Sequence, residues 1–397
     1  MAKVKKVYFP GMNGIRFIAA FSVIFHHIEQ SKFWIEMPSW WNSTIVDNIG
    51  HKGRIIFFVM SGFLITYLFL AEIKKTGSLD LKKFHIRRNL RVWPLYIVII
   101  LLSFFVLPLI NNITCSHCGF EYGPTSFSDL LTISYWKKFF LYFFMFANVG
   151  RFLWPPIPGL SQLWSIGVQE QFYLIWPTIT KVFKKGFLPM VVIFILGKVI
   201  IEAILLFYTA NWDLYQLPFI NVLQLGTLLK FWEIFAVEQL ALGALAAYIF
   251  IEGKSKILNI IYNKYFAILT VAIYIFLFFV KVDFYFHGLV EGMIATFLLL
   301  NISTNAKFPI KLEHPTLNYL GNISYGIYLF HNFFIILTIN LLMNFNLNEN
   351  LVIFNILLYA ISISLTLIFS GLSYKYFEMH FLKLKGKFEV VKSSRKL

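Results

Sequence analysis

Long apolar segments recur along the whole chain, and this feature limits the possible folds more than any other. Hydrophobic residues occupy 58% of the 397 positions, charged residues occupy only 14%, and the mean hydropathy is +0.71. A helix needs about 20 apolar residues to cross a hydrocarbon core of ~30 Å. The sequence therefore predicts an all-α protein, a polytopic bundle of transmembrane helices. The expected spans are residues 14–30, 53–72, 92–110, 164–183, 187–209, 232–251, 265–281, 288–303, 320–343 and 351–372.

A further apolar piece, residues 139–149, decides the predicted topology. It is short for a span, and the helix-breaking segment 154–159 follows it. If this piece is re-entrant or interfacial, ten spans remain and both termini are cytoplasmic. In that topology 25 Lys and Arg residues lie in inner segments and 8 lie in outer loops. This split follows the positive-inside rule, whereas a crossing piece would place every later basic loop outside. We therefore predict about ten spans with one short re-entrant or interfacial segment.

The net charge of +16 does not indicate a nucleic-acid partner. The basic residues lie between apolar spans and not on one soluble face, so they are interpreted as topology signals and contacts with lipid head groups. We expect one membrane domain over residues 1–375 and a basic cytoplasmic tail over residues 376–397. The expected location is the cell (inner) membrane, which the chain crosses several times.

The two cysteines, Cys115 and Cys118, flank Ser-His in a loop that is expected outside the membrane. They could form a tight disulfide, or they could form half of a metal site with His117. Two thiols and one imidazole are too few to indicate zinc, so no metal site is predicted.

Arg16 and His27 are ionisable residues of the first apolar segment. At ~100° per residue their separation corresponds to three helical turns plus about 20°, so the side chains share one face, about 16.5 Å apart along the axis. His26 is rotated by about 80° the other way. Ionisable groups at membrane depth are costly and are therefore candidate site residues. The alternative is a snorkelling Arg16 and a His27 that is hydrogen-bonded to a neighbouring helix.

Ser61 and Gly62 lie within the second predicted span. Small residues in membrane helices usually permit close helix packing, and we favour this role. The alternative is that the Ser61 hydroxyl belongs to a site beside His27.

Three arginines, Arg87, Arg88 and Arg91, form a dense cationic cluster before the third span. Arg88 and Arg91 share a face if this stretch is helical. The cluster could be a stop-transfer and lipid anchor, or its guanidinium groups could clamp a phosphorylated donor through bidentate contacts.

Polar residues also interrupt two later spans. Glu170 stands between Gln169 and Gln171, and inside the bundle it must be neutral or paired, so a structural pairing with an arginine and an acid/base role remain open. Tyr325, Tyr328 and His331 occupy one late span, where His331 alone is more often a satisfied bundle residue than a catalyst. Lys198 and Glu202 are one helical turn apart and are expected to neutralise each other.

Six motifs in this order resemble the acyltransferase-3 family of multi-pass membrane acyltransferases, which includes bacterial polysaccharide O-acetyltransferases. Together they extend over nearly the whole chain. The motifs are Gly14-Ile-Arg16 with His27, Phe57-Phe-Val-Met-Ser-Gly-Phe63, Arg87-Arg-Asn-Leu-Arg-Val-Trp-Pro-Leu-Tyr96, Trp164-Ser-Ile-Gly-Val-Gln-Glu-Gln-Phe-Tyr173, Gly321-Asn-Ile-Ser-Tyr-Gly326 with His331, and Tyr374-Lys-Tyr-Phe-Glu378.

The chain departs from the family pattern at two positions. The family often has two adjacent acidic residues where this chain has Gln169 and Glu170, so only Glu170 can carry an acidic role. The usual proline after the closing glutamate is His380 here, which affects the end of the last helix.

The resemblance implies an O-acyltransferase that moves an acyl group, commonly acetyl from acetyl-CoA, to a hydroxyl of a cell-envelope glycan or small molecule. It implies His27 as the base or acyl relay and Arg16 as its partner. The expected partners are an acyl-CoA donor, the hydroxyl acceptor and membrane lipids, with no tightly bound cofactor.

In this mechanism, a histidine accepts the proton of the attacking hydroxyl, and Tyr325, Ser61 or Gln171 could donate to the oxyanion. The donor would bind at the arginine cluster and extend its acyl arm along the Arg16–His27 face. The alternative is a transporter or flippase without acyl-transfer chemistry, but the paired repeats typical of such proteins are not visible in the sequence.

Overall fold

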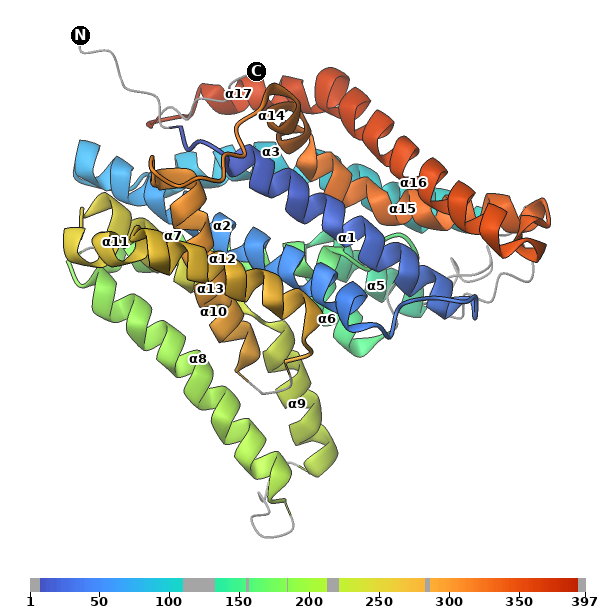
Figure 1. Ribbon diagram of the computed structural model, residues 1–397, viewed down its shortest axis with the longest axis horizontal. Helices are drawn as coiled ribbons and strands as arrows, with labels where there is room; N and C mark the ends of the chain where they lie inside the picture. Colours follow the sequence, from blue (N-terminus) through green and yellow to red (C-terminus); the bar gives the residue numbers. More distant parts are fainter. Residues whose placement is uncertain are drawn as a thin grey trace.

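The computed structural model describes residues 8–109, 133–154, 157–183, 185–212, 221–282 and 286–391. In these ranges all regular secondary structure is helical, so the predicted all-α class is confirmed (Figure 1). The elements are α1 (Met12–Trp34), α2 (Thr44–Thr76), α3 (Leu81–Leu101), η1 (Leu102–Val106), α5 (Ile133–Phe143), α6 (Ala147–Leu153), α7 (Leu163–Val182), α8 (Phe187–Ala210), α9 (Val222–Ile234), α10 (Val237–Ile251), α11 (Ser255–Ile261), α12 (Lys264–Phe279), α13 (His287–Thr304), α14 (Pro315–Asn322), α15 (Ser324–Asn344), η3 (Leu347–Glu349), α16 (Leu351–Ser373), η4 (Tyr374–Glu378) and α17 (Met379–Gly386).

Seven helical stretches in the described residues are long and apolar enough to cross a membrane, and an eighth is the pair α11 and α12, which is bent by 57°. The stretches are α2, α3 with η1, α8, α9 with α10, α13, α15, and α16 with η4 and α17. The two remaining predicted spans correspond to α1 and α7, whose polar residues lower their hydropathy. The structure thus establishes a multi-pass helical bundle, and the figure of about ten spans stays a prediction.

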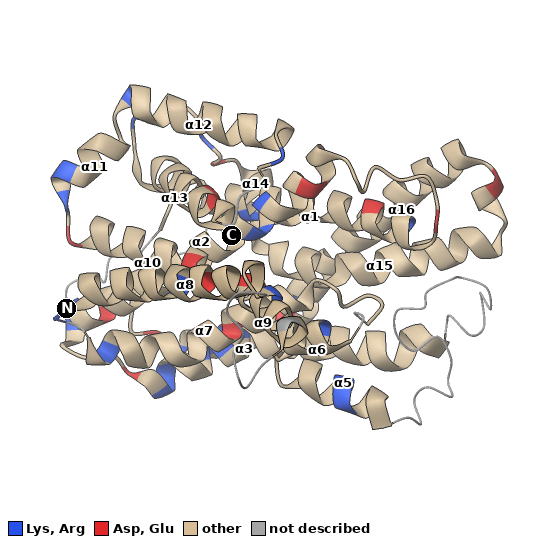
Figure 2. Ribbon diagram, turned by 90° about the horizontal axis from the view of Figure 1, so that it is seen from below, with Lys and Arg blue, Asp and Glu red and all other residues tan. Residues whose placement is uncertain are grey.

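The two ends of the described chain lie at one end of the bundle. Lys75, in the last turn of α2, donates a hydrogen bond to the Val390 carbonyl, and Arg87 of α3 donates to the Phe388 carbonyl. At the other terminus Tyr8 donates to Glu313, which lies between α13 and α14. Many of the Lys and Arg residues are on the same side of the molecule as the first turns of α3 and α11 (Figure 2). This arrangement fits termini on one face of the membrane, and the cytoplasmic assignment stays a prediction from the charge distribution.

Residues 139–149 lie in the two short helices α5 and α6. These helices have 11 and 7 residues, and Met145 between them adopts a left-handed φ of 64°. Tyr96 of α3 donates a hydrogen bond to the Tyr142 carbonyl, and Tyr135 donates to the Phe104 carbonyl, so the turn is anchored on α3 and η1. Neither helix approaches the length of a span, which supports the predicted re-entrant or interfacial placement.

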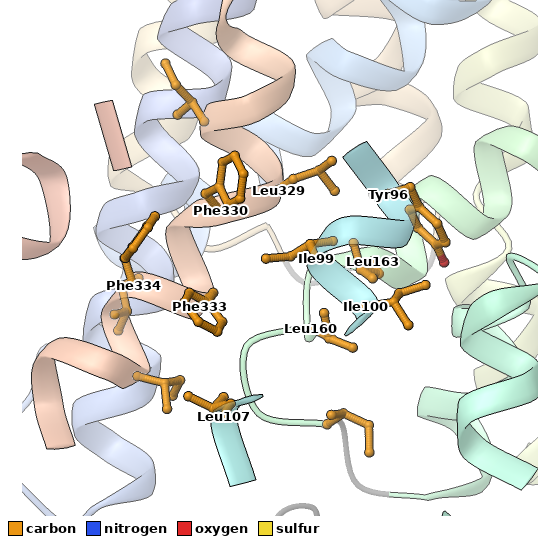
Figure 3. Close-up of a cluster of buried hydrophobic side chains, with 14 of the residues drawn as sticks. Tyr96, Ile99, Ile100, Leu107, Leu160, Leu163, Leu329, Phe330, Phe333 and Phe334 are labelled. Atoms are coloured by element: carbon orange, nitrogen blue, oxygen red, sulfur yellow. The ribbon is translucent and has the colours of Figure 1, made fainter. Parts of the chain in front are cut away.

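Apolar side chains of α1, α3, α15 and the segment before α7 form the largest buried cluster. Figure 3 shows its central part, in which rings of α15 face aliphatic residues of α3 and the start of α7. The labelled residues are Tyr96, Ile99, Ile100, Leu107, Leu160, Leu163, Leu329, Phe330, Phe333 and Phe334.

Helices α2 and α10 touch through glycine at two points. A Cβ added to Gly62 would lie 1.9 Å from the Leu240 carbonyl oxygen, and one added to Gly243 would lie 1.9 Å from the Val59 carbonyl oxygen. Both contacts are with helix backbone, which cannot move aside as a flexible side chain can. Gly62 therefore has the packing role that we favoured for the Ser61-Gly62 pair.

The sequence analysis placed several boundaries wrongly. Helix α2 begins at Thr44 and not at residue 53, so Lys52 and Arg54 lie within a helix instead of an outer loop. Lys52 is tolerated there because it pairs with Glu291 of α13 at 3.2 Å. The predicted span 320–343 is interrupted at Ile323, between α14 and α15. The cysteines Cys115 and Cys118 lie outside the described residues.

Replacing Gly62 by alanine should lower the thermal unfolding midpoint of the purified protein, because the added methyl overlaps the backbone of α10. Overpacking of this kind costs about 1–3 kcal/mol. The matched control is Gly197→Ala on α8, where no described atom beyond the local backbone of the same helix and the neighbouring residues lies within 4 Å of the added carbon. A midpoint that is unchanged by Gly62→Ala would contradict the close α2–α10 contact.

The predicted topology can be tested with Lys185→Cys and Leu347→Cys, each in a chain in which Cys115 and Cys118 are serine. We expect position 185 to be protected from a membrane-impermeant thiol reagent in intact cells and position 347 to react. The physical reason is the charge distribution, which assigns the loop before α8 to the inner side and the loop before α16 to the outer side. Reaction at 185 or protection at 347 would refute this topology.

Candidate active site

A cavity of about 290 Å³ lies among α1, α2, α3, α7, α15 and α17. Its wall combines aromatic and aliphatic side chains with basic ones, a composition that is typical of a ligand site. The lining residues are Tyr8, Phe9, Met12, Asn13, Arg16, Phe57, Met60, Ser61, Leu64, Ile65, Tyr67, Leu68, Phe69, Phe84, Arg87, Arg88, Arg91, Val92, Ile166, Gln169, Tyr173, Ser324, Tyr325, Tyr328 and Lys385.

Five cationic residues from three helices line this cavity: Arg16 of α1, Arg87, Arg88 and Arg91 of α3, and Lys385 of α17. The described lining residues include neither Asp nor Glu. Low-dielectric walls around charges of one sign concentrate the electric potential and attract ions of the opposite sign. The cavity is therefore suited to a ligand with negative charge.

Two of the arginines are already paired with carboxylates that lie behind the cavity wall. Arg88 forms an ion pair with Glu170 of α7 at 2.9 Å, and its guanidinium carbon lies 4.0 Å from the centre of the Tyr173 ring. Arg87 pairs with Glu72 of α2 at 3.2 Å. These partners fix the two guanidinium groups in position, while each retains further N–H donors.

Arg16 and Arg91 are the least engaged of the cationic groups in the cavity. The hydrogen bond that Arg16 donates to a described residue goes to Asn13, at 3.1 Å, and Arg91 forms no ion pair with a described carboxylate within 4 Å. Their donors are therefore available to a ligand.

Glu170 has the structural partner that the sequence analysis considered. Arg88 Nε and one terminal nitrogen both approach Glu170 Oε1 at 2.9 Å, so the carboxylate is held by a charge-assisted contact from α3. Glu170 does not line the cavity. The geometry favours a positioning role for Glu170 over contact with a reacting group.

His27 and His331 form a buried pair between α1 and α15. His27 Nδ1 and His331 Nε2 are 2.9 Å apart, and His331 Nδ1 lies 3.2 Å from the Ile327 carbonyl oxygen. A carbonyl only accepts, so we assign the proton of neutral His331 to Nδ1, and its Nε2 then accepts from His27 Nδ1–H. This assignment leaves His27 Nε2 with a free lone pair, which is the state that a general base requires.

His26 lies on another face of α1. Its Nδ1 is 3.0 Å from the Val46 carbonyl oxygen of α2, and its ring packs against Trp41. The one-residue rotation therefore directs His26 toward α2 and His27 toward α15.

The histidine pair lies just beyond the cavity wall. Neither His27 nor His331 lines the cavity, but Tyr328 does, and its ring centre is 5.7 Å from that of His331. The Tyr328 hydroxyl is 2.6 Å from the Ser165 hydroxyl. Tyr328 thus lies between the cavity and the histidine pair.

The three proposed oxyanion donors differ in position. Ser61 and Tyr325 line the cavity, where Ser61 donates to Gln169 at 3.4 Å and Tyr325 donates to the Val92 carbonyl at 2.7 Å. Gln171 does not line the cavity, and its side chain exchanges hydrogen bonds with Asn148 of α6. Gln171 follows Gln169 by two residues on α7, so its side chain is rotated by about 200° around the helix axis relative to that of Gln169. It therefore points away from the cavity.

The sequence analysis missed several polar groups at the cavity, among them Tyr8 and Lys385. Burial and a hydrogen bond with the Glu313 carboxylate raise the pKa of the Tyr8 phenol, which therefore stays protonated. Lys385 was assigned to a separate tail, but α17 packs on α3 and brings it to the site. No sequence periodicity reveals this return of the chain.

Among described residues, no cluster of three or more His, Cys, Asp or Glu could hold a metal ion.

Comparison with known proteins identifies the family. The model of the family described as Acyltransferase domain (Acyl_transf_3) matches residues 9–375. The chain belongs to this acyltransferase-3 family. The resemblance noted from the six motifs is thereby confirmed.

Named bacterial relatives match over most of the chain. The peptidoglycan O-acetyltransferase OatA of Listeria monocytogenes is 28% identical over 85% of this chain and 51% of its own length. The O-acetyltransferase OatA of Staphylococcus aureus strain NCTC 8325 is 26% identical over 94% of this chain and 57% of its own length. A provisionally named O-acetyltransferase of strain COL is 27% identical over 96% and 58%.

The chain spans little more than half the length of these curated relatives. No solved structure matches it at a significant level.

Proposed function

We propose that this chain is an O-acyltransferase that takes an acyl group, most simply acetyl, from an acyl-CoA and transfers it to a hydroxyl of a cell-envelope glycan or small molecule. The observation that carries the proposal is the cation-lined cavity, which ends at Tyr328 beside the His27–His331 pair. Family membership and the names of the relatives support acyl transfer.

The donor argument rests on charge. Coenzyme A carries its negative charge on phosphate groups, and arginine binds phosphate through two parallel N–H donors. Arg16 and Arg91 have the most donors to offer, while Arg87 and Arg88 are held in position by their carboxylates. The acyl arm, which is neutral, would lie along the apolar wall that Phe57, Met60 and Leu64 provide. The acyl-CoA is a substrate in this proposal, with no tightly bound cofactor.

The chemical step follows from the histidine pair. His27 Nε2 takes the proton of the acceptor hydroxyl as its oxygen attacks the thioester carbon, and the thiolate of coenzyme A leaves. His331 orients His27 and fixes its tautomer through the 2.9 Å contact. Ser61 and Tyr325 line the cavity, and each would donate its O–H to the oxyanion after giving up its present hydrogen bond to Gln169 or to the Val92 carbonyl. For the acyl group to reach His27, the wall at Tyr328 has to open.

The acceptor would approach from the opposite face of the inner membrane, where the loops before α7 and α16 lie in the predicted topology. A hydroxyl of an envelope glycan is the proposed acceptor class, because one relative is named for peptidoglycan. A transporter without chemistry would leave the acetyl content of envelope glycans unchanged, so mass spectrometry of glycans and secreted metabolites separates the two functions.

We expect His27→Ala to abolish the acetyl mass that the chain adds, whereas His26→Ala should retain a substantial fraction. A general base contributes a rate factor of roughly 10²–10⁴, and only His27 belongs to the pair with His331. The measurement is mass spectrometry of envelope glycans and secreted metabolites from cells that express each variant equally. Equal losses in both variants would contradict the assignment of His27, and no acetyl mass with the unmodified chain would contradict the proposed function.

Arg88→Lys should raise the apparent KM for acetyl-CoA by about tenfold, because lysine keeps the charge but loses the bidentate fork and the contact with Tyr173. Arg91→Lys should act in the same direction. A topology role predicts full rescue by lysine, since the positive-inside rule depends on charge alone. The control is Lys82→Ala, which removes an exposed charge near the same surface. Donor titrations that leave KM and kcat unchanged in both lysine variants would assign the cluster to membrane anchoring.

A further inference from the structure

Two arginines that the proposed donor site does not use lie beside one tryptophan. The guanidinium carbons of Arg54 and Arg151 are 5.3 and 5.1 Å from the centre of the Trp164 ring. Arg54 belongs to α2, Arg151 to the last turn of α6 and Trp164 to the first turn of α7. All three residues are half-buried and keep some exposed surface. Three separate elements thus bring two cations together at an accessible aromatic ring.

Neither arginine forms an ion pair with a described carboxylate within 4 Å. Arg54 has one hydrogen-bond partner in the described structure, His51 Nδ1 at 2.8 Å. Glu238 is within electrostatic range of Arg54, but its nearest ion-pair partner is Lys198, at 3.9 Å.

The other nearby carboxylate, Glu291, is held by Lys52 at 3.2 Å and by His51 at 3.3 Å. Arg151 forms no ion pair with a described carboxylate, and its electrostatic neighbours include Tyr142, Tyr328 and Arg54. The local positive charge therefore exceeds the negative charge of the described residues around it.

Contacts with Trp164 do not compensate for this excess. A cation–π contact contributes about 0.5–2 kcal/mol, whereas removing an ion from water costs several kcal/mol. The two guanidinium groups also repel each other. Unpaired like charges held close together in a membrane protein are typical of a site for an ion of opposite charge.

The arginine pair lies next to the proposed reacting groups. Ser165 follows Trp164 and hydrogen-bonds to Tyr328, which contacts His331. Both arginines are within electrostatic range of Tyr328. Arg54 precedes Ser61 by about 10.5 Å along α2, toward the end of the helix that lies away from the chain termini. The pair therefore lies near the histidines and outside the donor cavity, toward the end of the bundle where the predicted topology places the acceptor.

We propose that Arg54, Arg151 and Trp164 form an acceptor subsite that binds an anionic group, a carboxylate or a phosphate, close to the hydroxyl that is acylated. This inference rests on the proposed function, which it extends by giving the acceptor a negative charge. The guanidinium groups bind the anion, and the Trp164 ring offers an apolar surface to the attached sugar or chain.

The test is isothermal titration of the full chain in phosphatidylcholine nanodiscs without acetyl-CoA. N-acetylmuramic acid is compared with N-acetylglucosamine, which lacks its carboxylate, and glucose 6-phosphate is compared with glucose. We expect the anionic member of at least one pair to bind about tenfold more tightly, since charge-assisted hydrogen bonds are stronger than neutral ones. The pair that shows the preference distinguishes a carboxylate from a phosphate.

Arg54→Gln and Arg151→Gln should each remove most of this preference, and Arg151→Lys should restore part of it. Lys137→Gln is the matched control, because it removes one exposed positive charge from α5. A thermal unfolding midpoint for each variant excludes loss of the fold. Equal affinity within both pairs, no binding of any probe, or a preference that survives both glutamine substitutions would overturn the subsite. Since no acyl group is transferred in this assay, a failure of the proposed function would instead appear in the acetyl analysis of the His27 variants.

Discussion

A buried charge inside a membrane protein is costly unless another group compensates it, and the ion pair between Arg88 and Glu170 joins α3 to α7. Arg88 would be costly at this depth without Glu170, and Glu170 would be equally costly without Arg88. The Tyr173 ring, one turn beyond Glu170, covers the guanidinium group. Because this pair joins two helices that also contribute cavity residues, the position of the wall depends on it. The ion pair is thus a geometric constraint first and a source of net stability only secondarily.

The same principle extends to the neighbouring elements. Arg87 connects α3 to Glu72 of α2 and to the chain after α17, so the basic end of the bundle is closed by contacts among three segments. Close backbone contact at Gly62 and Gly243 holds α2 against α10, which fixes the helix that contributes Ser61 to the cavity. The cationic cavity therefore results from pairings that lie behind its wall, and the unpaired arginines remain on its surface.

The histidine pair shows a different kind of constraint, in which the donor and acceptor direction of each hydrogen bond matters more than charge. The Ile327 carbonyl can only accept, so it fixes the proton of His331 and, through it, the proton of His27. A chain of two hydrogen bonds thereby prepares one nitrogen as a proton acceptor without any charged partner. Tyr328 lines the cavity and contacts His331, so the histidine pair lies next to the cavity without lining it.

The sequence by itself determined the helical class, the positions of most spans and the residues that carry polar chemistry. Hydrophobic length and charge bias are local properties of the sequence, so spacing alone could predict the apolar segments, the different directions of His26 and His27, and the Lys198–Glu202 pair. The Lys198–Glu202 ion pair is observed at 2.6 Å. The order of the family motifs indicated the candidate site residues, but it did not indicate which of these residues are in contact with one another.

Only the tertiary structure decided that Glu170 pairs with Arg88, that Lys385 returns to the cavity, that Gln171 faces away and that Arg54 meets Arg151 at Trp164. Each of these depends on how helices distant in sequence rotate and pack, and their rotation follows from the combined cost of burying every polar group in the bundle.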